Sequence, residues 1–538
     1  MKFNEAFQKI RLGPFAALFI LAIAVVTWSR FYYVNPDGLE YIGIARLLKL
    51  GAWYDTVNGL RGPLISWLIA FLSTFLPELF AARLIVSLSS LLTVLVSWFI
   101  IKAIIKDKVL RRVAILTIMF MPVIMDTTAL ITPDTLLSVM ALVAFYFGIR
   151  FIRKPDYRTA GILGVVWALA YYAKSFGFVF AIVFFILLWF IALLPYERKT
   201  VTVVSKSLVF GLVIFGSVTL PWLIALRHKY GHWMFSYAGK FNLFYQGAYP
   251  QKENQSLRRD APWLESGTFT KDNKMGGYHD FCPPGDILFT YSVFEIDPYL
   301  QLKTFFANLR SLVRFFWDMF GLSSIPILFG LFFSLYVPIG EKRFQLLSSG
   351  CILWVLMYCV LLVDRRYLMP VVPLIVIIAC RGYEAVYHKL RRHCQNLSVH
   401  KYGRILSILL LIQLVSSFVW GINRVAHYIK RYHTETSKYV ALARDLAETY
   451  GIEKLTHTNS CGHTIGYLAY LGDIPYAGAI FLDRHEEDWL DLIKRGNISH
   501  VVFLSGELDD SETDGLKLVR EFSARRKEHS MYEVLYND

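Results

Sequence analysis

Long apolar segments constrain this chain more than any other feature. A helix needs about 20 predominantly apolar residues to cross a bilayer, and only structures that satisfy all of their backbone hydrogen bonds persist there. Several runs with almost no charged residue approach that length, so the sequence predicts a polytopic α-helical membrane protein. These runs are Pro14–Trp28, Leu84–Ile101, Val179–Leu194, Ser207–Leu226, Leu346–Val363, Val371–Ala379 and Ile405–Trp420.

The composition agrees with a membrane protein. Of 538 residues, 55% are hydrophobic, 16% aromatic and 18% charged. Soluble domains are about 45–50% apolar and about 25% charged, and disorder requires low hydrophobicity, so both of those classes are excluded. The net charge of +15 does not indicate a nucleic-acid partner, because residues 424–538 hold 14 Lys and Arg against 19 Asp and Glu. The basic excess belongs to the hydrophobic part.

The charge distribution predicts the topology. With a cytoplasmic N-terminus, the short inner loops hold 23 Lys and Arg against 6 Asp and Glu, as the positive-inside rule expects. The first span is predicted to be retained rather than cleaved, and Leu64–Leu76 is predicted to be an interfacial helix on the outer surface. The eleven expected spans are about 13–30, 82–101, 111–126, 135–152, 160–174, 177–195, 206–226, 319–338, 346–363, 367–383 and 404–422.

Two domains follow from this topology. Residues 1–422 form the transmembrane module, with outer loops at 31–81 and 228–309. Residues 423–538 form an extracytoplasmic domain whose helix-like and apolar segments indicate a small α/β unit. Cys282 and Cys461 are predicted to lie outside, where an oxidising compartment would let them pair; the sequence leaves that pairing open. No cysteine spacing indicates a zinc or haem site.

Two acidic residues lie at the predicted outer membrane surface. Asp37 follows the first span in Asn35-Pro36-Asp37-Gly38, and Asp134 lies in the turn Thr132-Pro133-Asp134-Thr135 between the third and fourth spans. A carboxylate at the membrane edge is costly and often functional, and it can act as a general base. Each acid also fits the cap of a helix, and both interpretations stay open.

Basic residues at the same surface oppose the overall charge bias. Each one alone fits an interfacial anchor. Together, beside two acids, they indicate an anionic ligand, for which phosphate is the natural candidate. His228 and His232 fit interfacial residues better than metal ligands, because no nearby carboxylate completes a ligand set. The basic residues are Arg46, Arg61, Lys174, Arg227, Arg365 and Arg366.

These motifs resemble the GT-C glycosyltransferases, in the branch that contains lipid A aminoarabinose transferase and protein O-mannosyltransferases. The resemblance covers roughly residues 10–385, in the same order and on the predicted outer side. The matching segments are Pro36-Asp37 with Tyr41 and Arg46, Arg61-Gly62-Pro63-Leu64 with Trp67, Ala81-Ala82-Arg83-Leu84, Thr132-Pro133-Asp134, Ala173-Lys174-Ser175, Pro221-Trp222 and Arg366-Tyr367-Leu368-Met369-Pro370.

The resemblance implies a polyprenyl- or dolichyl-phosphate-linked sugar as donor and an acceptor hydroxyl on a glycolipid, glycan or protein. Asp37 would be the catalytic base of an inverting transfer, and Asp134 would orient the acceptor or a basic partner. Arg61, Lys174, Arg46 and Arg366 would neutralise the phosphate. The long outer loop would cover the cleft, for which the further candidates are Glu40, Tyr41, Arg227 and Tyr367.

One departure from the family pattern concerns a metal. Many relatives have Asp-Glu or Asp-Asp at the first site, whereas this chain has Asp37-Gly38, and Glu40 is the nearest other carboxylate. We therefore predict neither a metal nor another cofactor. The alternative function is a multi-pass transporter or lipid flippase, which would place charged residues near the bilayer midplane. The expected location is a bacterial inner membrane, with an endoplasmic-reticulum location left open, and the sugar and the acceptor are not identified.

Overall fold

The computed structural model describes most of the helical part of the chain and portions of its C-terminal part. The described residues are 11–193, 198–245, 296–393, 397–431, 437–450, 452, 455–458, 468, 476–480, 499–504, 516–524 and 527–534. They fall into two units. The first comprises Met1–Ser29, Val57–Gln246 and Pro298–Ile429, and the second comprises Arg30–Thr56, Gly247–Asp297 and Lys430–Asp538.

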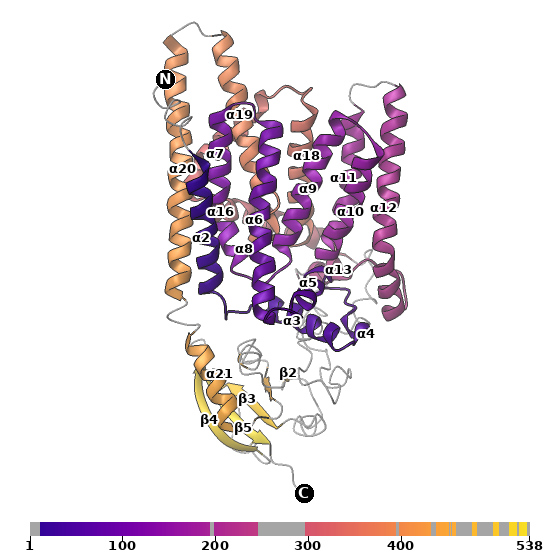
Figure 1. Cartoon of the computed structure of the whole chain (residues 1–538), viewed down its shortest axis with the longest axis vertical. Coiled ribbons are helices and arrows are strands. Elements are labelled where there is room, and N and C mark those ends of the chain that lie inside the picture. Colours follow the sequence, from indigo (N-terminus) through magenta and orange to yellow (C-terminus); the bar gives the residue numbers. More distant parts are fainter. Residues whose placement is uncertain are drawn as a thin grey trace. The chain divides into compact units, whose positions relative to one another are not determined.

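The first unit is a bundle of helices (Figure 1). Its helices are α2 (Leu12–Ser29), α5 (Leu64–Leu72), α6 (Glu78–Ile104), α7 (Lys108–Met119), α8 (Pro122–Thr128), α9 (Asp134–Arg153), α10 (Tyr157–Ala173), α11 (Phe176–Ala192), α12 (Arg198–Tyr230), α13 (Ala238–Tyr245), α16 (Pro298–Phe320), α17 (Ser324–Phe333), α18 (Lys342–Leu361), α19 (Val372–His393) and α20 (Leu397–Arg431). Short 3-10 helices lie at η2 (Gly321–Ser323), η3 (Ser334–Tyr336) and η4 (Arg365–Leu368).

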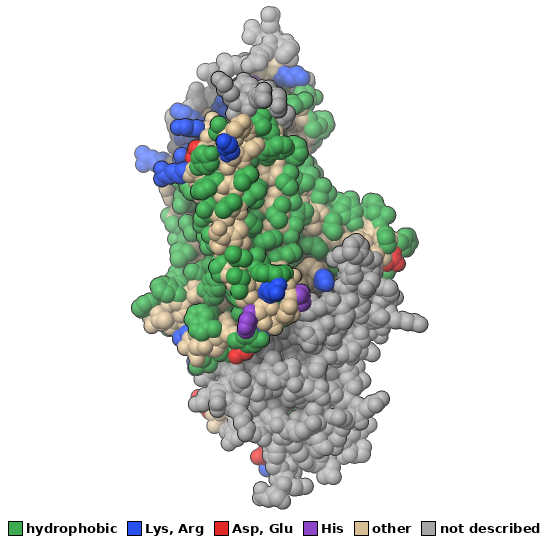
Figure 2. Space-filling view, turned by 90° about the vertical axis from the view of Figure 1, so that its right-hand side faces the viewer, with side chains coloured by type: hydrophobic (Ala, Val, Ile, Leu, Met, Phe, Trp, Pro, Cys, Tyr) green, Lys and Arg blue, Asp and Glu red, His purple; other side chains and the backbone are tan. Residues whose placement is uncertain are grey.

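Seven helical segments among the described residues are long and apolar enough to cross a membrane, which confirms the polytopic helical class. Figure 2 shows hydrophobic side chains covering one face of the bundle, with Lys and Arg side chains gathered toward one end. The seven segments are Leu12–Ser29, Glu78–Ile104, Asp134–Arg153, Val201–Tyr230, Pro298–Tyr336, Lys342–Leu361 and Ile405–Arg431.

The other expected spans fall on shorter or more charged helices. The one expected at 111–126 is divided between α7 and α8, because Pro122 at the start of α8 lacks the N–H that would continue the preceding helix. Helix α11 is apolar but has only 17 residues. Helix α5 has nine residues, about 14 Å, which is too short to cross a bilayer.

The expected outer loop at 228–309 differs from the structure at its end. Residues 246–295 lie outside the described residues, but from Pro298 the chain is a 23-residue helix, α16. Lys303, Arg310 and Arg314 interrupt its apolar residues. This segment therefore lacks the uninterrupted apolar run from which the other spans were predicted.

The basic loops lie together at one end of the bundle. The Arg153 Nη2 and Arg343 Nη1 atoms donate to the carbonyl oxygen of Ala103 at 3.3 and 3.0 Å. The Glu384 carboxylate accepts the backbone N–H of Asp107 at 2.6 Å, so it holds the start of α7. These contacts join the predicted inner loops 102–112, 150–158, 340–344 and 381–404 at what we call the basic end.

The opposite end of the same helices carries Asp134. Helix α9 runs for 20 residues, about 30 Å, from Asp134 to Arg153 at the basic end. That length matches the hydrocarbon thickness of a bilayer. Helices α10 and α18 begin near the basic end, so Lys174 and Arg366, which follow them, also lie at what we call the Asp134 end.

The second unit contains a mixed five-stranded sheet of order β2-β1-β3-β5-β4. Strand β1 is parallel to β2 and β3, whereas β5 is antiparallel to β3 and β4. Helix α21 (Ser437–Tyr450) buries Leu446 with Val502 and Met531 of the sheet, which agrees with the small α/β region that the sequence predicts. The strands are β1 (Leu455–Thr458), β2 (Tyr476–Ile480), β3 (His500–Leu504), β4 (Leu516–Ala524) and β5 (Lys527–Val534).

Candidate functional site

A buried carboxylate between two cations is the centre of the candidate site. Asp134 is the first residue of α9, and its side chain is 2% exposed. The Lys174 Nζ donates to Asp134 Oδ1 at 2.7 Å, and the Arg366 Nε lies 3.8 Å from Oδ2. The capping position falls on Pro133, so the Asp134 carboxylate holds two basic residues rather than capping α9. The Lys174 and Arg366 side chains remain 22% and 24% exposed, so both cations are also accessible to an anionic ligand.

The turn between α10 and α11 places Lys174. Helix α10 ends at Ala173, and the Lys174 N–H donates to the Ala170 carbonyl at 2.9 Å. The Gly177 N–H donates to the Lys174 carbonyl at 2.8 Å. A Cβ on Gly177 would lie 2.6 Å from the Ala170 carbonyl carbon, so only glycine permits this close turn.

An aromatic stack supports the Lys174 ammonium group. The Nζ lies 3.4 Å from the centroid of the Tyr367 ring, a cation–π geometry. Tyr358 stacks on Tyr367 at 5.2 Å, and Phe176 stacks on Tyr358 at 4.0 Å. The Trp354 Nε1 donates to the Tyr367 carbonyl at 3.1 Å. Buried rings of α11 and α18 therefore fix the face that Lys174 contacts.

Arg366 and Tyr367 reach the site from η4, directly after α18. The Asp364 side chain accepts the Arg366 N–H at 3.0 Å and caps this short helix. The Asp364 carboxylate also lies 3.8 Å from the Arg366 Nε. The Arg-Tyr pair that the sequence singled out is thus presented by one turn, with both side chains directed at Lys174 and Asp134.

The Arg61 segment packs against the end of α10. A Cβ on Gly62 would lie 2.5 Å from the carbonyl oxygens of Tyr172 and Ala173, so the two backbones are in contact immediately before Lys174. The Asn58 side chain accepts the Arg61 N–H at 3.0 Å and shapes this turn. The structure therefore brings the Arg61 segment to the Lys174 turn.

Trp67 joins three of the sequence motifs. Its ring makes edge contacts with Tyr172 at 5.3 Å and with Trp222 at 5.7 Å. Trp67 belongs to the Arg61 motif, Tyr172 directly precedes Ala173-Lys174, and Trp222 belongs to Pro221-Trp222. These aromatic residues form one core cluster beneath the site.

Arg227, by contrast, lies elsewhere. It is exposed at the end of α12, and its guanidinium lies over the Trp233 ring at 4.8 Å. Within the described part of the chain, no contact joins it to Asp134. This placement fits an interfacial anchor better than a residue of the Asp134 group.

The remaining candidates belong to the second unit. Asp37 lies in the first turn of α3 (Pro36–Lys49), where a negative charge is favourable to the helix dipole. The cap position falls on Asn35, not on Asp37. Glu40 and Tyr41 follow at helical spacing and are buried, and Arg46 lies in the last turn. Helix α4 (Trp53–Thr56) completes this segment.

Arg83 lies in the segment Ala81-Ala82-Arg83-Leu84 but is not among the site residues predicted from the sequence. Arg83 is 1% exposed, and its Nη1 donates to the Ala129 carbonyl at 2.9 Å, so it fixes the turn between α8 and α9 that presents Asp134. Its signal in the sequence is an arginine just inside an apolar span. Such a residue is rarely tolerated without a partner.

The described residues contain no group of three or more His, Cys, Asp or Glu side chains that would hold a metal ion, and the sequence-based expectation of a metal-free site remains a prediction. Cys351, Cys359 and Cys380 are buried free thiols within the helices. Cys282 and Cys461 lie outside the described residues.

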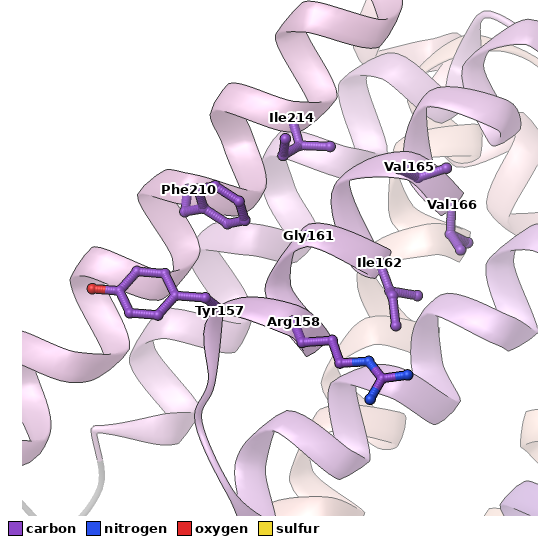
Figure 3. A pocket seen from close by; sticks show the side chains of 8 residues that line it. All are labelled: Tyr157, Arg158, Gly161, Ile162, Val165, Val166, Phe210 and Ile214. Atoms are coloured by element: carbon purple, nitrogen blue, oxygen red, sulfur yellow. The ribbon is translucent and has the colours of Figure 1, made fainter.

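A shallow groove of about 530 Å³ lies on the surface of the bundle (Figure 3). Helices α10 and α12 form it where they pack closely through Gly211, whose Cβ would lie 2.6 Å from the Ala160 carbonyl. The groove is apolar apart from the residues that begin α10 near the basic end, and it is separate from the Asp134 group. Its lining residues are Tyr157, Arg158, Gly161, Ile162, Val165, Val166, Phe210 and Ile214.

The fold defines a polytopic integral-membrane protein, with this group of charges at one end of its helices. Residues 60–224 match the model of the family described as dolichyl-phosphate-mannose-protein mannosyltransferase. That segment contains Arg61, Asp134 and Lys174.

Two solved structures share the fold over nearly the whole chain. ArnT from Cupriavidus metallidurans bound to undecaprenyl phosphate has a TM-score of 0.59 at 14% identity, covering 97% of this chain and 98% of that one. The apo state of the same ArnT has a TM-score of 0.55 at 13% identity, with the same two coverages of 97% and 98%. No curated protein sequence matches the chain.

Proposed function

We propose that this protein transfers a sugar from a polyprenyl-phosphate donor to an acceptor hydroxyl at the membrane surface of the Asp134 end. The observation that carries the proposal is the arrangement of Lys174 and Arg366 around one buried carboxylate, Asp134. The family match over residues 60–224 and the fold of an ArnT bound to undecaprenyl phosphate support a lipid phosphate as the anion.

In this mechanism Asp37 accepts the proton of the acceptor hydroxyl. The hydroxyl oxygen attacks the anomeric carbon, the bond from that carbon to the phosphate oxygen breaks, and the configuration inverts. The leaving lipid phosphate takes up the electron pair. Lys174, Arg366 and Arg61 stabilise its charge, because cations positioned before the reaction cost no reorganisation in the transition state.

The Asp134 carboxylate serves this scheme by orienting its two cations. Its contact with Lys174 at 2.7 Å and the Tyr367 ring at 3.4 Å from the same Nζ hold the ammonium group from two sides. A transporter would place such charges near the bilayer midplane, whereas these three charged residues lie at one end of their helices. We therefore favour the transferase.

We further infer that the N-terminus and the basic end face the cytoplasm and that the reaction takes place outside it, in a bacterial inner membrane. The gathering of the basic loops at one end supports this orientation. Labelling single cysteines placed at Lys154 and at Asp364 with an impermeant reagent in intact cells tests it. We expect the Asp364 position to react and the Lys154 position to be protected, and the reverse pattern would contradict the orientation.

The decisive assay uses the purified full-length protein with a polyprenyl-phosphate sugar and candidate acceptors. We expect acceptor-dependent release of polyprenyl phosphate, and loss of that release in Asp37→Asn. Asp55→Asn, which removes an exposed carboxylate of the same unit, is the matched control and should retain activity. Binding of donor without turnover for any acceptor, or full transfer by Asp37→Asn, would contradict the mechanism.

A further inference from the structure

Helix α16 carries three cations in one line. Lys303, Arg310 and Arg314 are separated by seven and four residues, so they project from the same side of the helix. All three are exposed, and within the described part of the chain none of them forms an ion pair. They lie toward the Asp134 end, where the positive-inside pattern does not account for basic residues.

An exposed apolar stripe lies beside this line of cations. Its residues recur every three or four positions along α16, and each is at least 40% exposed. They are Tyr299, Leu302, Phe306, Leu309, Val313 and Trp317. A basic face next to a stripe of aromatic and aliphatic side chains is typical of a helix that lies in the plane of a membrane interface.

The contacts of α16 with α18 show that the two helices cross. The Gln301 Nε2 donates to the Val360 carbonyl at 2.7 Å, and the Asn308 Nδ2 donates to the Cys359 carbonyl at 2.9 Å. Two residues of α16 that are seven positions apart, about 10 Å along the helix, therefore donate to adjacent carbonyl groups of α18. If the two helices ran side by side, residues seven positions apart on one helix would contact residues similarly far apart on the other.

The C-terminal part of α16 also lies at the Asp134 end of the bundle. Asp318 Oδ2 lies 3.9 Å from the Arg365 Nη1, in the turn that follows α18. From Gln301 to Asp318 the helix thus covers about 25 Å while its partners span only residues 359–365. Helix α16 is the first part of the candidate span Pro298–Tyr336. Its partners nevertheless all lie at one end of α18, which is itself a candidate span, so α16 crosses that end of the bundle along the plane of the membrane surface.

We propose that α16 is an interfacial helix whose Lys303, Arg310 and Arg314 bind the headgroups of anionic phospholipids while its apolar stripe inserts among the acyl chains. Charge complementarity selects this occupant: each basic residue near an anionic membrane surface contributes about fivefold in affinity. The site is independent of the sugar transfer proposed above, since neither its cations nor its apolar residues belong to the Asp134 group.

Native mass spectrometry of the full-length protein with phosphatidylglycerol and phosphatidylcholine tests the cation line. We expect wild type to retain phosphatidylglycerol preferentially and Lys303→Gln/Arg310→Gln/Arg314→Gln to lose at least fivefold of that preference. Lys438→Gln/Arg444→Gln/Lys517→Gln removes three exposed cations of the second unit and should leave the preference unchanged. Equal preference in wild type and the α16 variant would overturn the proposal, as would equal retention of both lipids by wild type.

A second measurement tests the apolar stripe in protein that keeps all its charges. In liposomes with brominated phosphatidylglycerol, Trp317 should be quenched, so Trp317→Phe should remove part of the quenched fluorescence. If wild type and Trp317→Phe lose the same fluorescence to the brominated lipid, α16 does not contact the bilayer and the proposal is wrong.

Discussion

Lys174 and Asp134 form a 2.7 Å ion pair in which the carboxylate is 2% exposed and the ammonium side chain 22% exposed. The acid begins one helix and the base follows the end of another, 40 residues later. A buried carboxylate is stable only when its partners compensate for lost hydration. The pair therefore contributes to the stability of the bundle, and in the proposed function it also positions a cation for the lipid phosphate; mutation can separate these two roles.

Lys174→Gln should lower both stability and activity. It leaves the Asp134 carboxylate buried without its closest cation, so we expect a loss of about 3 kcal/mol, the low end for breaking a buried pair because Lys174 is partly exposed. The double variant Asp134→Asn/Lys174→Gln removes both charges and should recover most of the stability but not the release of lipid phosphate. Thermal unfolding in detergent and the donor assay measure the two effects. Recovery of transfer in the double variant would show that the pair is structural only.

Tyr367 should act through its ring rather than its hydroxyl. The Lys174 Nζ lies 3.4 Å from the ring centroid, and such a contact contributes about 1 kcal/mol. Tyr367→Phe keeps the ring and should retain donor use, whereas Tyr367→Leu should raise the KM for the donor about fivefold. Comparing KM and kcat in the two variants tests this. Equal loss in both would assign the effect to the hydroxyl instead.

Much of the fold and of this site could be predicted from the sequence because membrane insertion imposes simple rules. The apolar runs predicted the spans. The basic loops at 102–112 and 150–158 were predicted to lie on the same side of the membrane, and in the structure Arg153 donates to the Ala103 carbonyl at the basic end. Asp134, Lys174 and Arg366 were separate candidates in the sequence, and the structure brings them together.

What the sequence did not reveal depends on packing between distant segments. The stack of Phe176, Tyr358 and Tyr367 joins two helices far apart in the chain, and no local pattern distinguishes those rings from ordinary core residues. The sequence did not predict helix α16 as a helix, because its three cations interrupt the apolar residues by which the spans were recognised. The capping explanation for Asp134 fits the local sequence, but in the structure Pro133 holds the cap position and the Asp134 carboxylate contacts Lys174, 40 residues away.

Gly62 should not tolerate a side chain. A Cβ there would lie 2.5 Å from two backbone carbonyl oxygens, of Tyr172 and Ala173, and backbone atoms cannot move aside as a flexible side chain would. Gly62→Ala should therefore cost about 1–3 kcal/mol and reduce donor use, because it displaces the Arg61 segment from Lys174. Gly216→Ala in α12, where an added Cβ would meet no atom within 4 Å beyond the adjacent backbone of its own helix, is the control and should be neutral or stabilising. Equal melting temperatures for the two variants would contradict the close contact.

Asp156 caps α10 at the basic end and should give a pH-dependent contribution to stability. Its side chain accepts the Thr159 N–H at 2.8 Å and the Thr159 hydroxyl at 2.9 Å. The hydrogen bond from the Thr159 backbone N–H holds the pKa of the Asp156 carboxyl below its ordinary value of 3.8. Asp156→Ala should cost about 1 kcal/mol at pH 7.

Because the folded pKa of Asp156 is lowered, the extra stability of the ionised cap is present above pH 3.8 and is lost as the pH falls through the folded pKa. Asp156→Asn keeps a cap acceptor without a titrating group, so it should retain most of the stability at pH 7 but lack that acid-dependent loss. Thermal unfolding of wild type and both variants across this acidic range measures it. A wild-type advantage over Asp156→Asn that did not shrink on acidification would show that the charge of Asp156 does not contribute to the cap.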